Sequence, residues 1–97
     1  MKKYKLTDET KIVNGTTLRR IEALRDFGDV KSGDIGGWIE SEDNLSHDGN
    51  CWVYNDAQVS GDACVYGNAE VSSYARVSDK AQVFGNVRVS DNEEISD

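Results

Sequence analysis

Residues 49–96 repeat a six-residue pattern, and this repeat constrains the fold more than any other feature of the chain. They divide into eight words: GNCWVY, NDAQVS, GDACVY, GNAEVS, SYARVS, DKAQVF, GNVRVS and DNEEIS. Position five is Val in seven words and Ile in the eighth, position three is Ala in five, and positions one and two are mostly Gly, Asn, Asp or Ser. Side chains alternate faces along a strand, so positions three and five share an inner face, while Gly, Asn and Asp suit sharp corners. The repeat therefore predicts an all-β chain, folded as a parallel β-helix.

Two less regular words precede this repeat. Ile39 and Leu45 are six residues apart, as the fifth positions of IGGWIE and SEDNLS. The step from Leu45 to Val53 is eight residues, so the phase breaks at His47-Asp48. We expect a two-residue bulge at a corner there.

The N-terminal part lacks the repeat and carries a hairpin signal. Asn14-Gly15 lies between the β-prone runs 11–13 and 16–18, which is typical of a two-residue hairpin turn. Residues 17–25 fit two interpretations, because Leu, Ile and Leu recur there at a helical spacing. No residue caps a helix start, and this favours a strand that continues the hairpin.

The stretch 26–40 is dense in Gly and Asp and predicts turns. Its apolar side chains are expected to anchor these turns: Phe27, Val30, Ile35, Trp38 and Ile39. We therefore expect an N-terminal β-hairpin and turn cap over residues 1–40 and a hexapeptide-repeat β-helix over residues 41–97, together forming one compact unit.

The repeat resembles that of the hexapeptide-repeat proteins, in which an aliphatic residue is followed four positions later by a small one, as Val59 is by Ala63. Segments 20–40 and 45–54, with ALRDFGDV and GGWIE, are similar to the N-terminal module of the YdcK-like β-helix proteins of enterobacteria, phages and prophages. The resemblance implies a short left-handed coil of about three turns, with about 18 residues in each. It also implies a phage- or prophage-type member and a homo-oligomer, dimer or trimer, because left-handed β-helices often form trimers. It supplies no catalytic residues.

Outward positions 18 residues apart are expected to stack on one side of such a coil. One side then stacks Cys64 on Gln82 and Tyr66 on Phe84, with no formal charge at these positions. Exposed aromatic residues on an uncharged patch are typical of protein interfaces. A neighbouring side stacks Glu70 on Arg88 and the third side stacks Arg76 on Glu94, so both are expected to form cross-strand charge pairs. The interface candidates from the first two sides are Tyr66, Phe84, Cys64, Gln82, Trp52 and Tyr54.

Charge is distributed unevenly along the chain. Residues 1–40 carry eight Lys or Arg and seven Asp or Glu, net +1, whereas residues 41–97 carry three and eleven, net −8. The acidic surface candidates are Asp56, Asp62, Glu70, Asp79, Asp91, Glu93 and Glu94. An acidic surface repels phosphates, which disfavours direct binding to nucleic acid or anionic lipid, and it permits binding to a basic protein.

The sequence offers little catalytic chemistry. Acyltransferases that resemble this repeat usually rely on a His as general base, and the only His is His47, at the phase break. No Cys/His cluster has metal-ligand spacing, and no motif indicates a cofactor. Cys51 and Cys64 are expected to face opposite ways as free thiols. The N-terminal residues lack an apolar signal region and no run is long enough to span a bilayer, so a cytoplasmic protein of a bacterial host cell is expected.

These observations favour a non-enzymatic phage- or prophage-type β-helix protein that self-associates and binds another protein. One alternative is an acidic nucleic-acid mimic that inhibits a host nucleic-acid-binding or defence protein, in the manner of an anti-CRISPR protein. A second alternative is a vestigial enzyme similar to the hexapeptide acyltransferases.

Overall fold

The computed structural model describes residues 2–96, which are all-β apart from one short 3-10 helix, η1 (Glu42–Asn44). The three longer strands come first: β1 (Tyr4–Val13), β2 (Thr16–Ala23) and β3 (Ile35–Ile39). Eight two-residue strands follow: β4 (Trp52–Val53), β5 (Gln58–Val59), β6 (Cys64–Val65), β7 (Glu70–Val71), β8 (Arg76–Val77), β9 (Gln82–Val83), β10 (Arg88–Val89) and β11 (Glu94–Ile95). Each short strand occupies positions four and five of a word, because the other positions form the corners.

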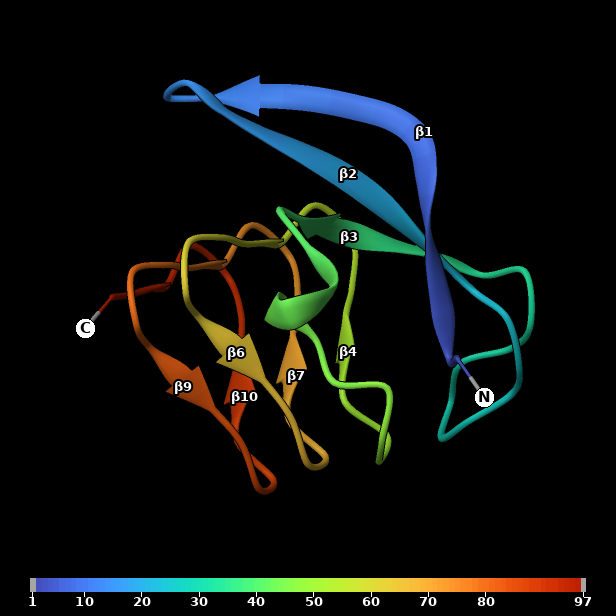
Figure 1. The fold of residues 1–97 in the computed structure, drawn as a ribbon. Helices are drawn as coiled ribbons and strands as arrows, with labels where there is room; N and C mark the ends of the chain where they lie inside the picture. The colour runs from blue at the N-terminus through green and yellow to red at the C-terminus, as the bar shows by residue number, and fades with distance from the viewer. Residues whose placement is uncertain (1, 97) are drawn as a thin grey trace.

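The strands of the coil form three sheets, which we call its walls (Figure 1). The hairpin wall contains β3, β5, β8 and β11, the aromatic wall contains β6 and β9, and the tryptophan wall contains β4, β7 and β10. Paired strands within a wall are parallel, and from β4 onward partners are 18 residues apart, as Trp52 is from Glu70. Backbone N–H groups donate to carbonyls of the next coil, as Tyr54 does to Val71 at 2.7 Å. The predicted short left-handed parallel β-helix of about three coils is confirmed.

The inner face of the coil contains the side chains that the repeat predicts. The Val residues at position five, from Val53 to Val89, are at most 2% exposed, and the Ala residues from Ala57 to Ala81 are at most 6% exposed. Val87 takes position three in its word and is 50% exposed. β-branched side chains fill the flat walls, while Ala fits where the backbone turns toward the axis.

The phase break is confirmed where it was predicted. Ile39 pairs with Val59, and Leu45 bridges to Val65, so these partners are 20 residues apart instead of 18. The two additional residues are His47 and Asp48, which lie in a bend between SEDNLS, the second irregular word, and GNCWVY, the first regular one.

The hairpin forms as predicted and projects beyond the coil as an arm (Figure 1). β1 and β2 pair antiparallel, and both turn residues, Asn14 and Gly15, have positive φ angles of 50° and 81°. Residues 17–25 are a strand over most of their length, since β2 reaches Ala23 and pairs with β3. The hairpin thereby extends the hairpin wall to six strands.

The turn region between β2 and β3 packs on the coil through most of its predicted anchors. Phe27, Val30, Trp38 and Ile39 are buried. Ile35 is 52% exposed, so the prediction that it anchors this region is wrong. It begins β3 at a position where the alternation of the strand turns its side chain outward.

Side chains of the N-terminal segment satisfy the first carbonyls of the coil. Lys3 is fully buried, and its Nζ donates to the carbonyls of Cys51 at 2.7 Å and Gly49 at 3.3 Å. The hydroxyl of Tyr4 donates to the carbonyls of Leu45 at 2.6 Å and Glu42 at 3.1 Å. These carbonyls belong to the first coil, and backbone N–H groups in the coil donate to the following coil, so a preceding coil would be needed to pair them. The N-terminal segment is therefore a cap built from side-chain donors.

Replacing Tyr4 by Phe is expected to lower the free energy of unfolding by about 1–2 kcal/mol at neutral pH, because the buried carbonyl of Leu45 loses its side-chain donor and the part-buried carbonyl of Glu42 loses one of two donors. Burial, and next the Glu42 carboxylate, raise the pKa of Tyr4 above its usual value. The folded state therefore retains this proton above pH ~10, where the unfolded state loses it, and the contribution of Tyr4 declines as pH rises further.

The difference between the wild type and Tyr4→Phe should thus be constant from pH 7 to 9 and shrink above pH ~10. Urea unfolding followed by tryptophan fluorescence measures it. Tyr74→Phe is the matched control, because Tyr74 is 65% exposed and should leave stability unchanged. If the difference in the free energy of unfolding stays constant well above pH ~10, burial does not raise the pKa of Tyr4 in the folded state.

Candidate functional site

The aromatic wall presents two stacked rings on its outer face. Tyr66 and Phe84 lie parallel, with ring centroids 5.1 Å apart and planes 9° apart. The Tyr66 hydroxyl donates to Oε1 of Gln82 at 3.2 Å, and Phe84 is 51% exposed. Cys64 pairs with Gln82 in the ladder and is half-buried. The structure therefore brings these four candidates together on one wall, in the predicted register.

The other two interface candidates lie on the tryptophan wall. Trp52 takes an outward position in its word, but it is only 1% exposed, because Phe27 and Tyr4 pack edge-on against its ring. The expectation that Trp52 presents a free aromatic surface is wrong, since the cap covers it. Tyr54 is half-buried, and burial raises the pKa of its hydroxyl.

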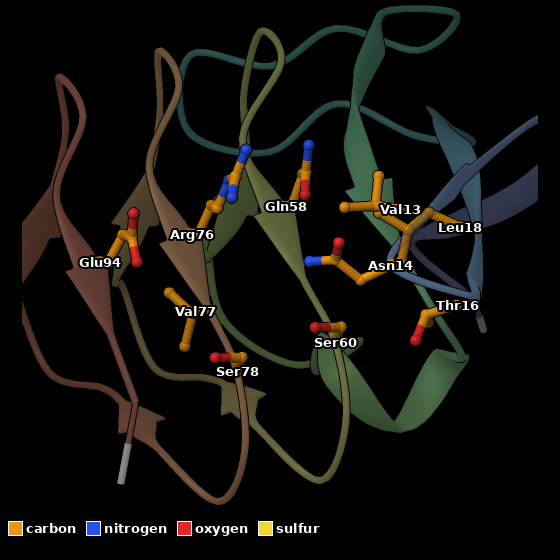
Figure 2. A pocket seen from close by; sticks show the side chains of 10 residues that line it. All are labelled: Val13, Asn14, Thr16, Leu18, Gln58, Ser60, Arg76, Val77, Ser78 and Glu94. Atoms are coloured by element: carbon orange, nitrogen blue, oxygen red, sulfur yellow. The ribbon is translucent and has the colours of Figure 1, made fainter.

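A groove of about 230 Å³ lies between the hairpin tip and the hairpin wall (Figure 2). Its floor is a row of side chains on three neighbouring strands: Gln58 on β5, Arg76 on β8 and Glu94 on β11. Val13, Asn14, Thr16 and Leu18 of the hairpin face this row, and Ser60 and Ser78 extend it. Sequence reasoning missed this groove, because the repeat places the floor but does not show where the hairpin arm lies.

A second groove, of about 260 Å³, follows the corner between the aromatic and tryptophan walls. Three Asn residues 18 apart, Asn50, Asn68 and Asn86, line it beside Glu70 and Arg88. The Oδ1 of Asn68 accepts a hydrogen bond from the backbone N–H of Asn50 at 3.3 Å, and its Nδ2 donates to the Oδ1 of Asn86 at 3.5 Å. The side chains of Asn68 and Asn86 form hydrogen bonds between stacked coils, so we interpret this groove as a structural corner.

Both ring nitrogens of His47, the candidate general base, form hydrogen bonds. Its Nδ1 accepts from the backbone N–H of Lys3 at 3.1 Å, so the proton lies on Nε2, which donates to Glu42 at 2.9 Å. The ring also stacks on Tyr4, with centroids 4.1 Å apart. Hydrogen bonds from His47, and next from Lys2, lower the pKa of Glu42. This arrangement fixes the N-terminal segment to the first coil and leaves no free ring nitrogen to accept a substrate proton.

The acidic candidates are spread over the corners and walls. Asp56 lies 3.3 Å from Arg20 of the hairpin, a contact that the repeat did not predict. Glu70 lies 3.7 Å from Arg88, as the predicted register requires. Asp62 and Asp79 are exposed on consecutive coils at the corner that borders the aromatic wall. The remaining three lie near the hairpin wall: Asp91 and Glu93 at its corner, and Glu94 in the groove.

Both cysteines are free thiols, with Cys51 buried and Cys64 half-buried. Within residues 2–96, no group of three or more His, Cys, Asp or Glu side chains is placed to hold a metal ion. No helix in this part of the chain combines the length and apolar character needed to cross a membrane.

The fold and the stacked wall define a short β-helix protein of the hexapeptide-repeat type. No protein-family model matches the chain. The chain is similar to the Escherichia coli (strain K12) protein named Uncharacterized acetyltransferase YdcK, with 40% identity over 68 residues. The match covers 62% of this chain and 21% of that protein, so the chain spans about a fifth of the relative's length. The fold and this relative together fit a hexapeptide-repeat β-helix family.

Proposed function

We propose that this chain is a non-enzymatic β-helix protein that binds other proteins, a second copy of itself included, through the aromatic wall. The observation that carries the proposal is the stacked pair Tyr66 and Phe84. Phe84 is 51% exposed, and the outward positions of β6 and β9 carry no formal charge. Aromatic side chains supply large contact areas at low entropic cost and are enriched in interfaces.

The charges around the wall favour contact between two copies there. With a net charge of −7, two copies repel each other over most of their surface, and the uncharged wall is where that repulsion is weakest. Asp62, Asp79 and Lys80 lie along one border of this wall, all exposed. A two-fold arrangement can place each Lys80 against the acidic border of the other copy.

Replacing Phe84 by Lys is expected to weaken self-association by about 10-fold or more, since a buried ring becomes a desolvated charge. Sedimentation equilibrium over a concentration series, at low salt and at about 0.5 M salt, measures the dissociation constant. The apolar contact should persist at high salt. Tyr74→Lys is the matched control, because Tyr74 is an exposed aromatic residue at a corner away from this wall.

A wild-type protein that stays monomeric at every concentration would overturn the self-association. In that case photo-crosslinking from position 84, compared with position 74, tests the contact with a different protein. Equal crosslinking from both positions would show that the aromatic wall is not the binding surface.

Two alternatives have less support. The acetyltransferase name of the relative favours acyl transfer, and acetyl-coenzyme A binding that is lost in His47→Gln would support it. Both ring nitrogens of His47 are occupied, which weighs against a role as base. An acidic nucleic-acid mimic needs carboxylates in contiguous rows, whereas two of the candidates are paired with Arg side chains. Competition with DNA for a basic partner would support mimicry.

A further inference from the structure

We propose that the groove under the hairpin tip binds a free amino acid through its charged ammonium and carboxylate groups. The groove lies on the hairpin wall, and its residues are separate from those of the aromatic wall. It lies between two structural units, with the coil as its floor and residues of the hairpin arm facing that floor (Figure 2).

The floor presents opposite charges at the spacing of neighbouring strands. Arg76 pairs with Glu94 in the parallel ladder, and strands in a sheet lie about 4.8 Å apart. Despite this register, no ion pair joins the two side chains, and the Arg76 guanidinium has no hydrogen-bond partner within residues 2–96. The guanidinium fork matches a carboxylate, and the Glu94 carboxylate matches an ammonium group.

Other ligand charges fit this floor less well. A simple anion would meet Arg76 but would be repelled by Glu94 and by the net charge of −7. A simple cation would meet Glu94 but would be repelled by Arg76. A ligand with a positive and a negative group on one carbon satisfies both side chains, and the amide of Gln58 can bond to the free carboxylate oxygen.

The remaining lining sets the size and the polarity of the ligand. The half-buried Val13 offers apolar surface to an aliphatic side chain, Leu18 adds little because it is only 1% exposed, and Asn14 on the hairpin turn offers an amide. The volume of about 230 Å³ is below the ~300–1,000 Å³ typical of drug-sized ligands. A single amino acid such as leucine therefore suits the groove better than a peptide.

Titration of the full chain with L-leucine, followed by amide chemical shifts in ¹H–¹⁵N NMR spectra, tests the proposal. Isocaproate, which lacks the ammonium group, and isopentylamine, which lacks the carboxylate, are the matched ligands. We expect saturable shifts at Gln58, Arg76 and Asn14 with leucine, and affinities weaker by about 10-fold or more for both analogues, because each loses a charged hydrogen bond.

Arg76→Gln and Glu94→Gln should each weaken leucine binding by a similar factor, about 10-fold or more. Arg88→Gln is the control on the tryptophan wall and should leave binding unchanged. Equal responses to leucine and isocaproate would overturn the zwitterion and identify a carboxylate site. The absence of saturable shifts at millimolar leucine in the wild type would overturn the proposal altogether, and neither result bears on the aromatic wall.

Discussion

Asn44→Ala is expected to lower the free energy of unfolding by about 3–5 kcal/mol, among the largest effects of any polar substitution in this chain. Asn44 is fully buried at the end of η1. Its Oδ1 accepts from the backbone N–H groups of Glu40 at 3.0 Å and Ser41 at 2.8 Å. Its Nδ2 donates to the carbonyls of Gly61 at 3.1 Å and Ala63 at 2.9 Å. One side chain therefore satisfies four backbone groups.

The amide replaces a rung of the backbone ladder. Where the coil is regular, a backbone N–H bonds to a carbonyl of the next coil, as Cys64 does to Ala81 at 3.0 Å. At η1 the chain turns, and the N–H of Asn44 bonds to Ser41 instead. The Nδ2 of Asn44 then donates to the carbonyl of Ala63, which would otherwise accept from a backbone N–H. Truncation to Ala leaves the buried carbonyl of Ala63 and the part-buried groups of Ser41 and Gly61 without this partner, at about 1–3 kcal/mol for each group that stays unpaired, whereas the N–H of Glu40 keeps its bond to Val59.

Urea unfolding measures the change, since the buried rings of Trp38 and Trp52 report the packed state through their fluorescence. Asn92→Ala is the matched control, because Asn92 is an exposed corner residue whose substitution should change stability by less than about 0.5 kcal/mol. An Asn44→Ala variant within about 1 kcal/mol of the wild type would show that water replaces the four bonds without penalty.

The repeat predicted the features that depend on local alternation and on stacking. A fixed period of six determines which side chains face inward, and three words per coil determine which outward residues are neighbours. The stacked rings of Tyr66 and Phe84 and the Glu70–Arg88 pair follow this register, but the register does not decide which charges pair, since Arg76 and Glu94 are ladder partners without an ion pair within residues 2–96. The bend at His47-Asp48 was predictable because the spacing of aliphatic residues changes there.

The side-chain contacts of the cap and the position of the groove were not predictable in this way. Lys is rarely fully buried, and nothing near Lys3 in the sequence signals the carbonyls of Gly49 and Cys51 that it reaches. Trp52 has an outward position in its word, and only the fold of the cap decides that it is covered. Such contacts join segments 25 residues apart, as for Phe27 and Trp52, or more than 40 apart, as for Lys3 and Cys51, and periodicity carries no information about their distance.

Substitution of the corner glycines by Ala should destabilise the coil in a fixed order: Gly49→Ala most, Gly67→Ala next and Gly85→Ala least. All three residues have nearly the same φ, +71°, +71° and +69°, so the strain of a left-handed Ala is about equal, at about 1–2 kcal/mol. What differs is the space outside the corner. A Cβ on Gly49 would overlap the carbonyl oxygen of Gly67, one on Gly67 would lie 2.9 Å from the nitrogen of Gly85, and one on Gly85 would meet nothing within 4 Å.

The overlap involves backbone atoms of the neighbouring coil, which cannot rotate away as a flexible side chain can. We expect Gly49→Ala to lose about 1–3 kcal/mol more than Gly85→Ala, the usual range for overpacking. Urea unfolding of the three variants in parallel measures the order, and Gly85→Ala serves as the control for backbone strain. Equal losses at all three corners would mean that strain alone sets the requirement for Gly. A graded loss would mean that Gly at these corners is needed for the close approach of stacked coils.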